Sequence, residues 1–121
     1  IAPKWKLSIP DYTDGREAVR GLFNGRVMPD AILSDLWIQA LSALDALDQL
    51  KKQVPREVAL LALGDSFFCR HGRIQLSAVV EPAEEIGRQA AEIVLAMIED
   101  PNAGPIHRSV ANYTFAERGT T

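Results

Sequence analysis

Three side chains in one short stretch have the chemistry of a nucleophilic site. Ser66, Cys69 and His71 bring a hydroxyl, a thiol and an imidazole within six residues, and an adjacent histidine is a common activator of serine and cysteine nucleophiles. Closeness in sequence does not establish geometry, and most such pairs are surface polar residues. Cys69 also follows two phenylalanines, which is typical of a buried, inert thiol. A hydrolase is therefore a minor hypothesis, which a cluster of these side chains in a deep cleft would support.

Other chemical signatures are missing from the sequence. Residues 64–66, Gly-Asp-Ser, lack the flanking glycines of a nucleophile elbow, and neither Walker nor Rossmann glycine spacing occurs. Cys69 is the only cysteine and has no partner for a disulfide within the chain. With only His71 and His107 as histidines, a structural zinc site is not expected. We therefore expect no catalytic residues, no metal and no cofactor.

Length and charge restrict the possible classes of protein further. The length of 121 residues suits one compact domain. The composition, with 47% hydrophobic and 24% charged residues, is typical of a folded globular protein. The 16 acidic and 13 basic residues are mixed along the chain, which excludes a DNA-binding surface within it. The longest apolar run, residues 58–63, is too short to cross a bilayer, and no signal peptide opens the chain. We expect a cytoplasmic protein with no membrane partner.

Strand and helix patterns alternate along the chain. Residues 5–9 alternate apolar and polar side chains, whereas residues 58–63 are continuously apolar, as in a central strand that is covered on both faces. The patterns predict strands over 5–9, 31–33, 58–63, 74–80 and 108–115, helices over 15–23, 35–51 and 82–99, and a loop over 67–73. This alternation predicts an α/β fold with a mostly parallel sheet flanked by helices.

Local signals predict how the helices begin and end. Asp14 precedes Glu17 by three residues, so Asp14 is the expected N-cap of the first helix. Lys51 and Lys52 are expected in the last turn of the second helix, where cations complement the helix dipole. The last helix opens at Pro82.

Three stretches carry a family resemblance. They are PDAILSDLWIQALSALDAL followed by QVPREVALLALGD, then LSAVVEPAEEIGRQAAEIVLAMIE, and the closing YTFAERGTT with its near-terminal Arg118. Their order resembles the carboxyl-terminal part of the effector-binding core of lactose-repressor-type transcription regulators, which has a periplasmic-binding-protein-like fold of type I. The resemblance covers about three quarters of the chain, and DYTDGREAVRGL extends it more weakly toward the start.

The resemblance implies a domain organisation and a function. Residues 1–121 would be a partial effector-binding or sugar-binding domain, made of the carboxyl-terminal lobe and a crossover helix, residues 82–99. The helix-turn-helix and most of the amino-terminal lobe would be absent from this sequence. The implied function is to sense a small molecule, to dimerise, and to couple binding allosterically to the missing DNA-binding domain. A solute-binding protein of a sugar ABC transporter shares this fold and is the alternative, although the closing YTFAERGTT favours the regulator.

The resemblance also implies a ligand site at the carboxyl ends of the strands. Its candidate residues are Tyr12, Asp35, Trp37, Asp65 and Glu81. Tyr12 is either an aromatic that stacks on the effector or a turn residue that covers a helix end. Trp37 either stacks on a ring or packs in the core, since it lies on the apolar face of its helix.

Two departures from the family pattern change the expected effector. Leu36 and Trp37 replace the usual Asn-Asp pair, and Gly64 replaces an aspartate that commonly binds a sugar hydroxyl. Losing these acceptors shifts the expected ligand from a plain neutral sugar toward a sugar-like molecule with an aromatic, apolar or anionic part. Arg70, His71 and Arg73 offer positive charge to an anionic group, although a basic loop is also commonly just solvated.

The predicted last helix carries an apolar stripe. Ile86, Ile93, Val94 and Met97 recur at helical spacing, and an exposed stripe of this size is unfavourable. Because relatives pair through this lobe, we expect a homodimer or a higher assembly. The alternative is that the helix packs on its own sheet.

Overall fold

The computed structural model describes residues 15–102 and 104–121. The chain divides into two compact units, Ile1–Val80 with Phe115–Thr121, and Glu81–Thr114. The predicted strand over residues 5–9 lies outside the described residues.

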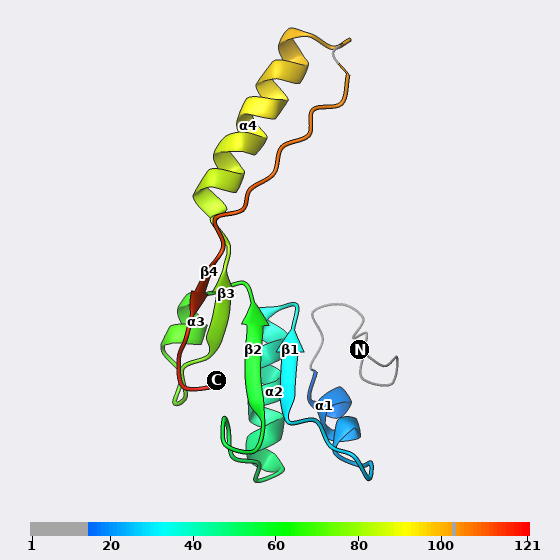
Figure 1. The fold of residues 1–121 in the computed structure, drawn as a ribbon, viewed down its shortest axis with the longest axis vertical. Coiled ribbons are helices and arrows are strands. Elements are labelled where there is room, and N and C mark those ends of the chain that lie inside the picture. Colours follow the sequence, from blue (N-terminus) through cyan, green and yellow to red (C-terminus); the bar gives the residue numbers. More distant parts are fainter. Residues whose placement is uncertain (1–14, 103) are drawn as a thin grey trace. The chain divides into compact units, whose positions relative to one another are not determined.

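The first unit is built on a sheet whose first three strands are parallel (Figure 1). These strands are β1 (Ala31–Ser34), β2 (Ala59–Leu63) and β3 (Ser77–Val80). They lie in the order β1-β2-β3-β4, with the short β4 (Thr114–Ala116) beside β3. Ala31 is paired with Ala59, and Leu61 with Ser77. The predicted α/β fold with a mostly parallel sheet is confirmed, and residues 58–63 supply its interior strand β2.

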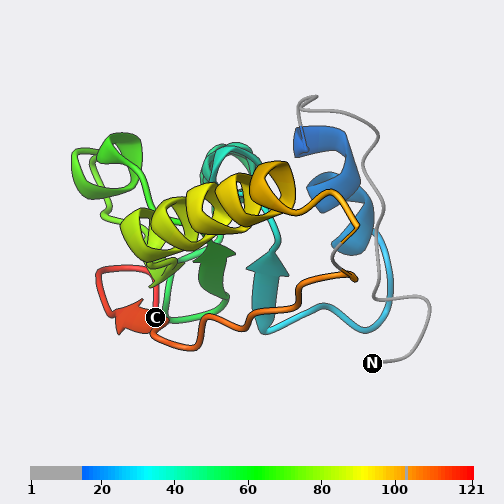
Figure 2. The same cartoon turned by 90° about the horizontal axis from the view of Figure 1, so that it is seen from above.

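Helices cover one face of this sheet. Helix α1 (Arg16–Leu22) packs against α2 (Trp37–Gln49), which connects β1 to β2 and packs on both strands. Viewed from above, both helices lie on the same side of β1 and β2 (Figure 2). A short helix, α3 (Phe67–Arg70), follows β2.

The core lies between α2 and the sheet. Leu60 and Ala62 of β2 are fully buried against Leu47 of α2. Leu61 and Leu63 point to the other face, and they are half-buried and exposed respectively. The expectation that this strand is covered on both faces is therefore wrong for the described part of the chain, because α1 and α2 both lie on one side.

The ends of the first two helices differ from those predicted. The N-cap of α1 is Gly15 rather than Asp14, and glycine has no side chain with which to cap. Helix α2 ends at Gln49, so Lys51 and Lys52 lie beyond its last turn. Lys51 has a φ of 58°, and the amides of Lys51 and Lys52 donate to the carbonyls of Asp48 and Leu47 at 2.9 Å each. This Schellman-type arrangement ends the helix through backbone bonds to carbonyls that the helix leaves free.

Two other segments are only partly as predicted. The expected loop over residues 67–73 contains α3, whose four residues are too few to produce a helical period in the sequence. Buried Cys69 anchors this turn, because its amide donates to Ser66 and its carbonyl accepts from the Leu76 amide. The strand expected over 108–115 is confined to β4, whereas α4 (Ala83–Glu99) matches the helix expected over 82–99.

The second unit is dominated by α4. No residue of this helix is buried, and its apolar residues Ile86, Val94 and Met97 are exposed. Its polar side is held by ion pairs from Arg88 to Glu85 and Glu92. Among the described residues, no helix combines the length and the apolar content that a membrane span needs.

We predict that Leu47→Ala lowers the free energy of unfolding of the chain by about 3 kcal/mol, because it removes a fully buried side chain and leaves a cavity beneath β2. Urea denaturation followed by circular dichroism measures the loss. Ile38→Ala, in the same helix but 40% exposed, is the control and should cost less than about 1 kcal/mol. Equal losses for the two variants would contradict the position of the core.

Candidate functional site

Three of the candidate site residues follow the carboxyl ends of the parallel strands of the first unit. Asp35 and Trp37 follow β1, and Asp65 follows β2 after Gly64. The carboxyl ends of parallel strands lie at one edge of a sheet, where α/β proteins commonly bind ligands. Glu81 follows β3 as the first residue of the second unit and is exposed. Tyr12 lies outside the described residues.

Asp65 is engaged by two arginines. Arg118 donates from Nη1 to Oδ1 at 2.9 Å and from Nη2 to Oδ2 at 2.8 Å, and Arg70 Nε lies 3.1 Å from Oδ2. The side chains of Asp65 and Arg118 are 5% and 13% exposed. The hydrogen bonds from Arg118 lower the pKa of the Asp65 carboxyl, and the same contact raises the pKa of Arg118. Both carboxylate oxygens are thus already paired with cations, and one carboxylate faces two positive charges.

The segment that carries Arg118 is anchored to the starts of β2 and β3. The Thr120 hydroxyl donates to the Leu60 carbonyl at 2.7 Å and accepts from the Ser77 amide at 2.8 Å. The Leu60 amide donates to the Thr120 carbonyl, and the Arg118 guanidinium also donates to the Leu76 carbonyl at 2.6 Å. Residues 118–120 therefore hold the sheet together from β2 to β3 and bring the arginine to Asp65.

Trp37 belongs to a line of rings on α2 and α3. Its indole is stacked on Phe68, with centroids 5.8 Å apart, and Phe68 meets Phe67 edge to face at 5.9 Å. Phe67 and Phe68 are 65% and 61% exposed, whereas Trp37 is half-buried. Our sequence interpretation treated this segment as a loop and missed both phenylalanines, although two adjacent phenylalanines just after a buried strand were a usable signal.

Gly64 gives the end of β2 a backbone conformation that other residues rarely adopt, beside the Trp37 ring. Its φ of 80° lies in the left-handed region, and a Cβ at this position would lie 3.7 Å from the Trp37 Cδ1 atom. The end of β2 thus combines a left-handed glycine, which has no acceptor side chain, with an aromatic neighbour.

The three nucleophile candidates do not form a catalytic arrangement. Cys69 is fully buried, with its Sγ 3.4 Å from the Ser66 Oγ. The His71 ring is stacked on Phe67 at 3.9 Å, and its Nδ1 lies 2.8 Å from the Phe67 carbonyl oxygen. The imidazole is thus held by Phe67, and a substrate cannot reach the thiol.

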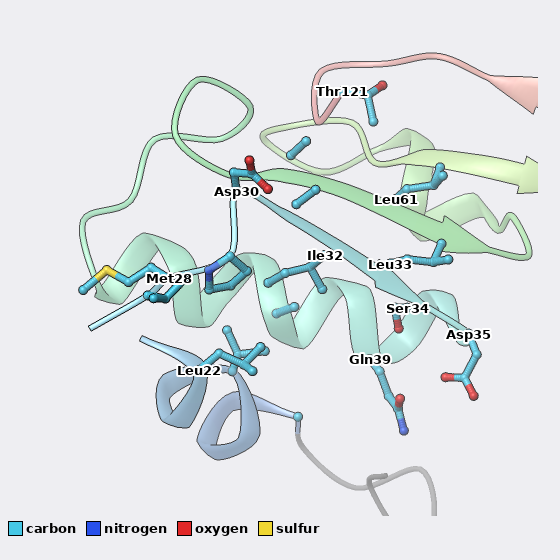
Figure 3. Close-up of a pocket in the computed structure, with 17 residues that line it drawn as sticks. Leu22, Met28, Asp30, Ile32, Leu33, Ser34, Asp35, Gln39, Leu61 and Thr121 are labelled. Carbon is cyan, nitrogen blue, oxygen red and sulfur yellow. The ribbon is translucent and has the colours of Figure 1, made fainter. Parts of the chain in front are cut away.

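Asp35 lies at a different place from Trp37, in a pocket of about 780 Å³ (Figure 3). The pocket runs along β1, and Leu22 of α1, Gln39 of α2 and Leu61 of β2 also line it. Asp35 and Ser34 form its end at the carboxyl end of β1. The structure thus places Asp35 in the pocket and Trp37 among the rings of α3, so the two predicted neighbours face separate surroundings.

We predict that Asp65→Asn lowers the free energy of unfolding at pH 7 by about 3 kcal/mol, because it leaves Arg118 without its bidentate partner in a nearly closed site. The lowered pKa also gives wild type a stability contribution that is complete above the ordinary aspartate pKa of 3.8 and is lost as the pH falls through the depressed value. Urea denaturation at several pH values should show this acid-dependent loss in wild type and its absence in the variant.

Asp48→Asn is the matched control, since Asp48 pairs with Arg73 where both side chains are exposed. It should change stability by less than about 0.5 kcal/mol. If Asp65→Asn were equally mild, the pair would not be a structural anchor.

Comparisons with known proteins agree with this architecture. The family model of the periplasmic binding protein-like domain matches residues 4–121. The transcriptional regulator CelR of Thermobifida fusca is 27% identical over 95 residues, which cover 78% of this chain and 28% of the relative. The ribose operon repressor of Haemophilus influenzae is 25% identical over 103 residues, covering 84% of this chain and 31% of the relative. This chain therefore spans less than a third of the length of either regulator.

Solved structures give the same result. A complex of the regulator CelR with cellobiose superimposes with a TM-score of 0.79 at 26% identity, covering 91% of this chain and 33% of the other. A LacI-family regulator from Bifidobacterium animalis subsp. lactis gives 0.76 at 26% identity, covering 88% of this chain and 39% of the other. With its parallel sheet and its match over residues 4–121, the chain belongs to the periplasmic binding protein-like domain family, in the form found in transcription regulators of the lactose-repressor type.

Proposed function

We propose that this chain senses a small-molecule effector for a transcription regulator of the lactose-repressor type, in the cytoplasm and without enzymatic activity. Residues 1–121 would form the carboxyl-terminal lobe and the crossover helix, residues 82–99. A helix-turn-helix outside this sequence would bind DNA. The observation that carries the proposal is the superposition on the CelR–cellobiose complex, which covers 91% of this chain.

The proposed mechanism is ligand-dependent closure of two lobes. An effector that binds both lobes favours the closed arrangement by the difference in its affinity for the two states, and this difference shifts the DNA-binding equilibrium. The alternative function, a solute-binding protein of a sugar transporter, would use the same closure. The named relatives are regulators, which favours the first function, and specific DNA binding by the intact protein would distinguish the two.

The proposed effector wall consists of Tyr12, Asp35, Trp37, Asp65 and Glu81. Asp65 contributes through the arginines it holds, because its own oxygens are already paired. Arg70 is the accessible member of that group, with a side chain 57% exposed, and can meet an anionic group on the ligand. Trp37 and the exposed rings of Phe67 and Phe68 supply apolar area.

The proposed effector is therefore a sugar or sugar-like molecule with an aromatic, apolar or anionic part. Two related regulators are named for ribose or solved with cellobiose, which supports a sugar core. The Leu36-Trp37 pair and Gly64 offer few side-chain acceptors for hydroxyl groups, so a plain neutral monosaccharide should bind poorly.

We predict that the intact regulator binds aryl or anionic glycosides more tightly than plain hexoses, and that Trp37→Ala weakens the binding about tenfold or more by removing ring contact. Isothermal titration calorimetry of the intact protein measures both effects. The chain of residues 1–121 alone should bind weakly, since it supplies one wall of the cleft.

The control is Phe115→Ala, which removes an exposed aromatic of β4 outside the proposed wall and should leave the affinity unchanged. Sub-micromolar binding of a plain hexose that is insensitive to Trp37→Ala would refute the proposed specificity.

We also predict that the chain forms a homodimer or a larger assembly at micromolar concentration, because the apolar residues of α4 are unfavourable in water. Sedimentation velocity should show a species heavier than the monomer. Val94→Asp, in the exposed stripe, should shift the distribution toward monomer, whereas the exposed polar exchange Glu99→Gln should not. A monomer in wild type at these concentrations would contradict the prediction.

A further inference from the structure

The connection between α1 and β1 contains the one asparagine of the chain that is followed by glycine. Asn24 directly precedes Gly25. The other two asparagines, Asn102 and Asn112, precede residues that carry a Cβ. The side-chain amide of an asparagine can be displaced by the backbone nitrogen of the next residue, and this attack is least hindered where that residue has no Cβ. Asn24 is therefore the asparagine whose sequence context most favours this chemistry.

The fold leaves this pair of residues accessible. Asn24 and Gly25 are both exposed and lie beyond the end of α1, in the loop that leads to β1 (Figure 1). The Asn24 backbone amide donates to the Gly21 carbonyl at 3.3 Å. Within residues 15–102 and 104–121, neither the Asn24 side chain nor the Gly25 amide makes a hydrogen bond. The backbone nitrogen that attacks and the carboxamide that it attacks are thus both free to react.

Both ends of this loop are fixed to the body of the first unit. Phe23, just before Asn24, is 8% exposed and belongs to the hydrophobic core. At the other end, the Asp30 carbonyl accepts from the Ala59 amide at 2.8 Å, which joins the loop to the sheet. Residues 24–28 between these two points are exposed. Because exposed loops change conformation more readily than the elements they connect, the reaction does not require the core to open.

We propose that Asn24 is a deamidation site of the folded chain. The Gly25 amide gives up its proton to hydroxide, and its nitrogen attacks the Asn24 Cγ. A bond forms between these two atoms while the bond from Cγ to the side-chain nitrogen breaks, and that nitrogen takes a proton from water and leaves as ammonia. A second water then opens the cyclic imide at either carbonyl, which gives aspartate or isoaspartate. The net reaction consumes one water and releases one ammonia, with no oxidation or reduction.

Charge next to this pair favours the first step and marks the product. Arg26 follows Gly25 and is exposed, and a nearby guanidinium stabilises the anionic backbone nitrogen. The product carries a new carboxylate, so the net charge of −3 becomes one unit more negative. The isoaspartate form also adds one backbone atom between α1 and β1. Neither Asn24 nor Gly25 belongs to the proposed effector wall, so the site holds whether or not the proposed function is correct.

Peptide mapping by mass spectrometry of the full chain, incubated at pH 7 and at pH 8, tests the proposal. Asn24 should be converted at least about tenfold faster than Asn112, which is also exposed but is not followed by glycine. The rate at Asn24 should rise with pH, because the anionic backbone nitrogen is the nucleophile. Ion-exchange chromatography of the undigested chain should show the product as a more acidic form.

Gly25→Ala should slow the conversion of Asn24 by about tenfold or more, because a Cβ hinders the attack. This variant should fold, since the φ of Gly25 is outside the left-handed region and an added Cβ would lie 3.5 Å from the Val27 carbonyl oxygen, its nearest neighbour. Gly87→Ala is the matched control, because it makes the same exchange in α4 where a Cβ meets no atom within 4 Å. It should leave the rate at Asn24 unchanged.

A synthetic peptide of residues 20–29 gives the rate without the fold. The folded chain should convert Asn24 within about tenfold of the peptide rate, because the loop leaves the pair exposed and without hydrogen bonds. Slower conversion than this in the folded chain would overturn the proposal, because the fold would then hold the pair in an unreactive conformation. A rate at Asn24 no greater than that at Asn112 would overturn it as well.

Discussion

The ion pair between Asp65 and Arg118 is the contact on which the first unit most depends. It joins the end of the interior strand β2 to a segment more than fifty positions later in the chain, through two hydrogen bonds in a nearly closed site. Thr120 completes this connection at the starts of β2 and β3. A single-residue change there leaves a charge without a partner, which costs far more than the loss of a surface pair.

The same contact affects what the edge of the sheet can bind. A carboxylate held by two guanidinium groups has little capacity left for the hydroxyls of a sugar, and the second arginine leaves an excess of positive charge. Next to it, Gly64 offers no acceptor side chain, and aromatic rings line α2 and α3. These features together support the proposed ligand, which carries an apolar or anionic part.

The edge of β1 and helix α4 both expose apolar residues, and they differ in the kind of partner that would cover them. The edge of β1 presents backbone donors and acceptors, which only another strand satisfies well. Helix α4 has satisfied its own backbone and exposes side chains alone, so any complementary apolar surface can cover it. Helix α4 therefore predicts association through side chains alone.

The sequence by itself determined the α/β class, the interior strand over residues 58–63 and the long helix over 82–99, because hydrophobic periodicity depends on side chains that are close in sequence. It also indicated that Asp35, Trp37 and Asp65 follow the carboxyl ends of strands. Only the tertiary structure decided that Asp65 is bound by Arg118, that Trp37 and Asp35 face different surroundings, and that Phe67 and Phe68 form a helix with exposed rings. Those outcomes depend on contacts between residues far apart in the chain, and no local pattern of residue types specifies which distant partner a side chain meets.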